Sequence, residues 1–97
     1  MAVVIANRFK GNHDHTALVR EGAAILKKHG ATSVRAGRIF AGPNSGQLMV
    51  VAVQPDLTAF GKGAQGLFAD PAWQKFLVEM SKVFELQERS ITVTEDF

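Results

Sequence analysis

Cysteine is absent from the 97 residues of the chain. Its absence excludes disulfide bonds, thiolate metal sites and thiol nucleophiles. No apolar run approaches the roughly 20 residues that a membrane-spanning helix needs. The opening segment MAVVIANR also lacks the basic leader of a signal peptide. These absences fit a reducing compartment, and we expect a soluble, cytoplasmic protein.

A large excess of positive charge is missing as well. Lysine and arginine together number 11 against 9 aspartate and glutamate residues, which gives a net charge of +2. The basic residues are scattered from Arg8 to Arg89, whereas nucleic-acid binding needs many of them on one face. The densest cluster, Lys27-Lys28-His29, lies where a helix is expected to end and complements its dipole. We therefore expect neither nucleic acid nor a membrane as a partner.

What is present is an ordinary globular composition, with 46% hydrophobic and 21% charged residues. This length allows one domain with a modest core, over residues 1–97. β-branched residues and alternation predict four strands, at residues 2–10, 32–41, 47–54 and 86–94. Helical spacing predicts one helix at 14–29. It predicts a second from Pro55-Asp56 onward, with a glycine-weakened first half and a restart at Asp70-Pro71.

The resulting order, β-α-β-β-α-β, is that of a ferredoxin-like α+β fold, in which two helices cover one face of a four-stranded antiparallel sheet. The strands carry apolar residues on both faces, since Val3 and Ile5 alternate with Val4 and Ala6. Something must therefore cover the face that the helices leave open. A second copy of the chain is the simplest candidate, because most soluble oligomers are two-fold homo-oligomers.

Residues 56–76, DLTAFGKGAQGLFADPAWQKF, contain an early aromatic residue, a break at Asp-Pro and then tryptophan and phenylalanine. With the order of elements, this pattern resembles the dimeric α/β-barrel superfamily. Within it, the chain resembles NIPSNAP-like and antibiotic-biosynthesis-monooxygenase-like proteins over nearly its whole length. The matching residues are Phe60, Asp70, Pro71, Trp73 and Phe76. The resemblance implies a homodimer or a larger ring. It leaves open cofactor-free oxygenases, haem-degrading enzymes, isomerases and decarboxylases.

The haem-degrading monooxygenases of this superfamily can be compared residue by residue. They carry an asparagine near the end of the first strand, a tryptophan in the second helix and an iron-ligating histidine in that helix. Asn7 is similar to the first element, and Trp73 is a shifted version of the second. No histidine follows His29. Because the axial ligand is the main anchor of haem iron, we expect no haem and no other cofactor.

Asn7 and Arg38 are the leading candidates for polar functional side chains. Asn7 shares a strand face with Phe9, and a buried amide must find partners. It either holds a substrate oxygen or bonds a backbone group or an arginine within the fold. Arg38, in an apolar setting, could bind a carboxylate or phenolate as a bidentate donor. The structural alternative for Arg38 is a pair with Glu88 or Glu95.

The run His13-Asp14-His15 contains three potential metal ligands. Without a fourth ligand at a recognisable spacing, this is a weak metal signal. Asp14 is more simply the cap of the following helix, so we expect no metal site. His13 or His15 could instead act as a general base at the mouth of a pocket.

An apolar stripe in the second helix includes Trp73, Phe76 and Met80. Such a stripe is most simply core or subunit contact, but this helix also walls the cleft beside the sheet. Together with Phe9 and Phe60, these residues are predicted to line a ligand pocket. The glycines of the helix's first half would let a ligand or another backbone approach closely.

Two functions remain open at this point. The first is a cofactor-independent oxygenase or isomerase for an apolar, aromatic substrate, in which Asn7 and Arg38 orient an enolate or phenolate. The second is a homodimeric module that binds a ligand, or serves as structure, without turning anything over. The sequence contains no unmistakable nucleophile, metal cage or acid/base pair, which favours the second function or an unassigned role.

Overall fold

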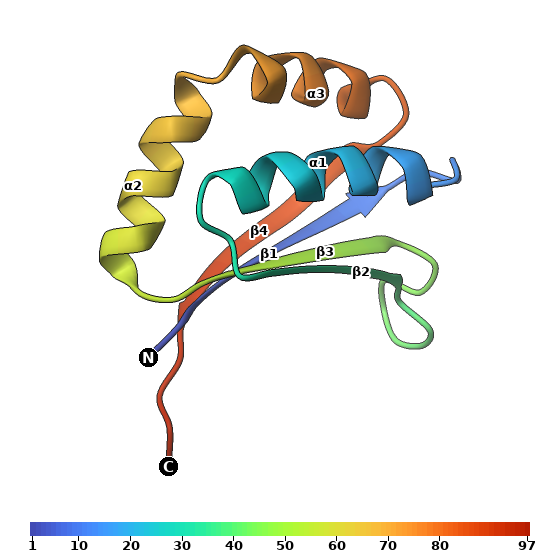
Figure 1. Ribbon diagram of the computed structural model, residues 1–97. Helices are drawn as coiled ribbons and strands as arrows, with labels where there is room; N and C mark the ends of the chain where they lie inside the picture. The colour runs from blue at the N-terminus through green and yellow to red at the C-terminus, as the bar shows by residue number, and fades with distance from the viewer.

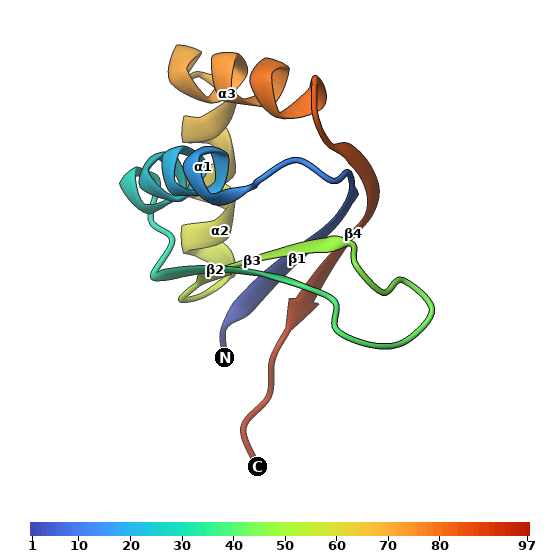
Figure 2. The ribbon, with the colours of Figure 1, turned by 90° about the vertical axis from the view of Figure 1, so that its right-hand side faces the viewer.

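The computed structural model describes residues 1–97 and shows one antiparallel sheet with three helices. The strands are β1 (Val3–Lys10), β2 (Ser33–Arg38), β3 (Leu48–Gln54) and β4 (Glu85–Val93), in the sheet order β2-β3-β1-β4. The helices are α1 (Thr16–Lys28), α2 (Leu57–Phe68) and α3 (Pro71–Ser81). All three lie on one side of the sheet (Figures 1 and 2). The ferredoxin-like prediction is confirmed. None of the helices is long and apolar enough to cross a membrane.

The predicted second helix is in fact two helices, α2 and α3. Asp70 between them has an extended backbone, with φ −92° and ψ 113°, and its carboxylate accepts a hydrogen bond from the Ala72 amide at 2.9 Å. Pro71 follows at the first helical position, and a proline disfavours helical geometry in the residue before it. The pair Asp70-Pro71, which starts α3, therefore also ends α2. Figure 1 shows α2 standing at one end of the sheet while α3 turns back above α1.

The strand predicted at residues 32–41 ends earlier, at Arg38. The chain then enters a loop in which Gly42 and Gly46 have positive φ angles of 112° and 87°. The Gly46 amide donates to the Ile39 carbonyl at 2.8 Å, which closes the loop. The Phe40 side chain is 98% exposed in this loop rather than on a strand face. The expected extension of the strand to residue 41 is wrong because turn geometry overrides the apolar pattern.

The core lies between the helices and one face of the sheet. Val3 and Leu48 on that face have no exposed surface. Leu48 packs in one buried cluster with three side chains from α3 and the segment after it: Phe76, Met80 and Phe84. Phe76 and Met80 of the stripe predicted for the second helix are thus buried in the core, and Trp73 is half-buried beside them.

The other face of the sheet carries no helix (Figure 2). Strand register and alternation place a group of half-buried apolar side chains at its centre. We call this group the open face; it consists of Val4, Ala6, Met49, Val51 and Val53. An ion pair of 3.2 Å between Arg8 and Glu88 borders it. The sheet is therefore apolar on both sides, and the helices cover one of them.

Candidate functional site

A cleft between the sheet and the helices holds two cavities. The first, of about 210 Å³, extends toward Val19, Gly22 and Phe84, and the second, of about 350 Å³, lies beneath α2 beside Phe60 and Ala64. Their walls are mostly hydrophobic. The two cavities share six lining residues at the centre of the cleft: Asn7, Leu26, Val50, Trp73, Leu77 and Arg89. The two cavities therefore meet beside one pair of polar side chains, Asn7 and Arg89.

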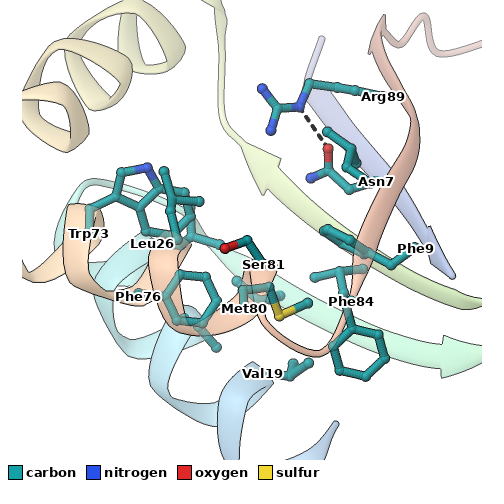
Figure 3. Close-up of a pocket in the computed structure, with 16 residues that line it drawn as sticks. Asn7, Phe9, Val19, Leu26, Trp73, Phe76, Met80, Ser81, Phe84 and Arg89 are labelled. Atoms are coloured by element: carbon teal, nitrogen blue, oxygen red, sulfur yellow. Dashed lines mark hydrogen bonds between the residues drawn. The ribbon is translucent and has the colours of Figure 1, made fainter. Parts of the chain in front are cut away.

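These two side chains, Asn7 and Arg89, are hydrogen-bonded to each other. Asn7 on β1 is the register partner of Arg89 on β4, and the Arg89 Nε donates to the Asn7 Oδ1 at 2.7 Å. Figure 3 shows the pair on the strand side of the first cavity, across from Trp73 and Leu26. Because Oδ1 accepts from the arginine, the Asn7 Nδ2 and the two terminal guanidinium nitrogens are the remaining donors. The pair therefore presents hydrogen-bond donors and a positive charge to an apolar cleft.

The remaining polar groups of the cleft are few. The Ser81 hydroxyl donates to the Val78 carbonyl at 2.7 Å. Gln54 donates through Nε2 to the His29 carbonyl at 3.2 Å, and its buried Oε1 has no hydrogen-bond partner. No carboxylate and no histidine lines either cavity. The cleft can hold a negatively charged or carbonyl oxygen, but its walls offer no side chain suited to accepting a proton.

The structure brings together the residues predicted to form the pocket. Asn7 and Trp73 line both cavities, Phe76 lines the first and Phe60 the second. Phe9 and Met80 join Phe76 in the first. The Trp73 and Phe76 rings are stacked, with centroids 5.2 Å apart and planes 25° apart. Trp73 therefore packs in the fold and walls the cleft at the same time.

Arg38 lies outside both cavities. Its guanidinium donates to the carbonyls of Gly11 and His13, each at 2.7 Å, and of Gly46 at 3.2 Å. It also lies 5.6 Å from the centroid of the Phe84 ring. The sequence left open a ligand or a carboxylate as the partner of Arg38. The structure instead shows backbone carbonyls, so Arg38 anchors the loop between β1 and α1.

The run His13-Asp14-His15 also lies outside the cavities. The His13 ring meets the Phe84 ring edge-on, with centroids 6.3 Å apart. The Asp14 carboxylate accepts from the Thr16 amide at 2.9 Å, and this backbone hydrogen bond lowers the pKa of Asp14 below its usual value. Nowhere in the chain do three His, Asp or Glu side chains gather in a way that could hold a metal ion. Asp14 thus satisfies an amide at the start of α1.

Arg89 is the residue that sequence reasoning missed. The register of β1 and β4 shifts between Arg8 and Phe9: Arg8 pairs with Glu88, whereas Phe9 pairs with Leu86. Such a bulge inserts one extra residue, so Leu86 and Arg89 both line the first cavity although they are three apart. Strict alternation would have put them on opposite faces. The available signal was that alternation places Arg89 on the same strand face as Ile91 and Val93.

The glycines of α2 determine how this helix closes the second cavity. A Cβ atom built at Gly63 would lie 2.5 Å from the His29 carbonyl oxygen, and one at Gly66 would collide with the His29 ring. Nothing lies within 4 Å of a Cβ built at Gly61. Two of the three glycines therefore let the end of α1 approach α2, while Phe60 and Ala64 on the same helix wall the cavity. The close approach predicted from these glycines is made by His29, through its backbone carbonyl at Gly63 and its ring at Gly66.

Asp70 ties the end of α1 to the start of α3. Its side chain is 7% exposed and lies 2.7 Å from His29 Nε2 and 3.3 Å from Lys28 Nζ. The hydrogen bond with His29, followed by that with the Ala72 amide, lowers the pKa of Asp70 to about 2. The carboxylate is therefore charged at neutral pH and holds the corner between α2 and α3 in place.

No protein-family model matches the sequence, and no curated protein is significantly similar to it. Solved structures are similar over almost the whole chain. An uncharacterized NIPSNAP domain protein from Burkholderia xenovorans has a TM-score of 0.76 at 20% identity, covering 100% of this chain and 97% of that one. The cofactor-independent oxygenase SnoaB from Streptomyces nogalater has a TM-score of 0.74 at 16% identity, and the match covers 99% of this chain and 95% of the SnoaB chain.

A NIPSNAP family protein of unknown function from Agrobacterium tumefaciens has a TM-score of 0.67 at 17% identity, covering 94% of this chain and 86% of that one. At such identities the similarity is one of fold, and fold alone does not carry an activity. The chain has the fold shared by NIPSNAP-family proteins and SnoaB, which confirms at this level the resemblance predicted from residues 56–76 and the order of elements.

Proposed function

We propose that the protein binds a flat, largely apolar molecule in the cleft, with an acidic oxygen held by Asn7 and Arg89. The observation that carries this proposal is the 2.7 Å hydrogen bond between these two residues where the two cavities meet. Pockets of this kind combine apolar walls with a few placed polar groups. A phenol, an enol or an aromatic carboxylic acid has the matching chemistry.

The charge of Arg89 favours the ionised form of such a ligand. The guanidinium offers two terminal nitrogens beside the Asn7 Nδ2, and charge-assisted hydrogen bonds to an anionic oxygen are stronger than neutral ones. Asn7 is half-buried and Arg89 exposed, so the pair lies at the solvent side of the apolar cleft and a bound ring would lie against the apolar walls. A bound phenol should therefore ionise at a lower pH than the same phenol in solution.

The test uses 2-naphthol, whose absorbance distinguishes naphthol from naphtholate. We expect the apparent pKa of bound 2-naphthol to fall below that of the free compound. Arg89→Gln should abolish the difference and weaken naphtholate binding roughly 10- to 100-fold, as expected for the loss of hydrogen bonds from a charged donor. Titration of the protein with the probe at several pH values measures both effects.

The matched control is Arg20→Gln. It makes the same change at an exposed position of α1 that lines neither cavity, and it should leave both the affinity and the pKa of the probe unchanged. If 2-naphthol does not bind, or binds equally well to Arg89→Gln, the proposed site is wrong.

A second candidate function is cofactor-independent oxygenation of the bound molecule. It is favoured by the fold shared with SnoaB and by a cleft built to hold an ionised, electron-rich aromatic ring. Since no side chain of the cleft is suited to accept a proton, ionisation would depend on Arg89 and solvent. Oxygen uptake with 2-naphthol, present in the wild type and lost in Arg89→Gln, would support catalysis. The absence of uptake despite binding would leave a binding module.

We also propose that a second copy of the chain covers the open face. The face has an apolar centre at Val4, Ala6 and Val51 and a charged border at Arg8 and Glu88, the arrangement of an apolar interface core within a polar rim. Two sheets packed face to face would bury both open faces at once, because a two-fold interface uses the same patch on each copy.

A further inference from the structure

We infer that Gly22 sets the length of ligand that the cleft accepts, because its missing side chain makes room for the ring of Phe76. This inference rests on the proposed function, since it concerns the size of the molecule whose oxygen Asn7 and Arg89 would hold. Gly22 does not contact that oxygen. It limits the first cavity, on one side of the polar pair.

The geometry around Gly22 is tight. Gly22 is the buried residue of α1 and lines the first cavity together with Phe76 of α3. A Cβ built at Gly22 would lie 2.6 Å from the Cζ of Phe76, 2.9 Å from its Cε1 and 3.1 Å from its Cε2. Carbon atoms in contact prefer separations of about 3.5 to 4.0 Å. The outer edge of the phenylalanine ring therefore occupies the space that any side chain at position 22 would need.

A displaced Phe76 ring has few places to go. Only 7% of Phe76 is exposed, the Trp73 ring is stacked on it at 5.2 Å, and Leu48 of the same core cluster has no exposed surface. Interiors are packed closely enough that such neighbours do not yield freely. The unfilled space beside the ring is the first cavity. An alanine at position 22 should push the ring into this cavity and shorten it.

The second cavity should be unaffected by this change. Neither Gly22 nor Phe76 lines it, and its outer wall comes from α2 residues such as Phe60 and Ala64. Ligands that extend to both sides of Asn7 and Arg89 need both cavities. A shorter ligand needs only one of the two cavities. Gly22 is therefore a specificity-determining residue that discriminates by length.

The experiment compares two phenols on Gly22→Ala. In 9-phenanthrol the hydroxyl lies midway along three fused rings, so the rings must enter both cavities, whereas 2-naphthol fits in the second alone. We expect Gly22→Ala to weaken 9-phenanthrol binding roughly tenfold or more, because a size difference of one methylene in an apolar pocket has an effect of this order. The affinity for 2-naphthol should be unchanged. Gly61→Ala is the matched control, since its Cβ meets nothing within 4 Å.

A second measurement needs no ligand. Trp73 is the only tryptophan of the chain and stacks on Phe76, so its near-ultraviolet circular dichroism reports on that ring. The signal should change in Gly22→Ala and stay the same in Gly61→Ala. Adding Phe76→Leu to Gly22→Ala removes the ring that collides, and this double variant should regain 9-phenanthrol binding.

Four results would overturn the inference: an unchanged 9-phenanthrol affinity, equal loss of both phenols, a gain in 9-phenanthrol affinity because α1 and α3 spread apart, or an unchanged Trp73 signal. Failure of the proposed function looks different. In that case the wild type binds neither phenol, or Arg89→Gln binds both as well as the wild type does.

Discussion

Replacing Gly11 by alanine is expected to destabilise the fold by about 3 kcal/mol, from backbone strain and overpacking together. Gly11 has a φ of +154°, which L-residues rarely adopt. A Cβ there would lie 2.5 Å from the Val83 carbonyl oxygen and 2.8 Å from a ring carbon of Phe84. The first neighbour is backbone and cannot rotate away. For a domain of this size, the melting temperature should fall by on the order of 15 °C.

Two other glycines separate the causes of this effect. Gly42 also has a positive φ, of +112°, but nothing lies within 4 Å of a Cβ built there. Gly42→Ala should therefore lose stability only through backbone strain, by about 1 kcal/mol. Gly61 lies within α2 with open space around it. Gly61→Ala should stabilise the protein by up to about 1 kcal/mol through helix propensity.

Chemical denaturation of the three variants at equal protein concentration measures these differences. The expected order of stability places Gly61→Ala first, then Gly42→Ala and last Gly11→Ala. An equal loss of stability in Gly11→Ala and Gly42→Ala would show that position 11 does not require glycine because of its contact with Val83 and Phe84. The loop that Arg38 anchors through the Gly11 carbonyl would then be more adaptable than the structure indicates.

Replacing Val51 by lysine on the open face should dissociate the proposed dimer. Val51 lies at the centre of this face, opposite Ala6 and Arg35 in the strand register. A two-fold interface would bury two added lysines without partners, and burying an unpaired charge costs several kcal/mol. We expect association to weaken by more than about 100-fold. The fold should be retained, since the side chain faces away from the core.

Sedimentation velocity compares the subunit number of the wild type and Val51→Lys, and circular dichroism checks that both are folded. Gln65→Lys, which adds the same charge at an exposed site on α2, should remain dimeric. Native mass spectrometry of freshly purified wild-type protein adds the mass of any retained ligand. A wild-type protein that is monomeric throughout would refute the proposed pairing of open faces.

The sequence by itself determined the kinds of elements and their order, except that the predicted second helix is two helices, α2 and α3. Alternating β-branched residues specify strands, and Asp70-Pro71 specifies where α3 begins, because these signals act within a few residues of chain. The same local signals placed Asn7 on one face with Phe9 and put Trp73 and Phe76 in one helical stripe. Six of the predicted site residues therefore line the cleft: Asn7, Phe9, Phe60, Trp73, Phe76 and Met80.

Only the tertiary structure decided which polar groups meet. The partner of Asn7 depends on the register of β1 and β4, which places Arg89 opposite it, and the bulge beyond Glu88 lets Leu86 face the same cleft. Arg38 binds carbonyls of a loop that is distant in sequence, and Gly22 makes room for a ring 54 positions later, at Phe76. Register, bulges and close packing arise between segments, so no local period or propensity encodes them.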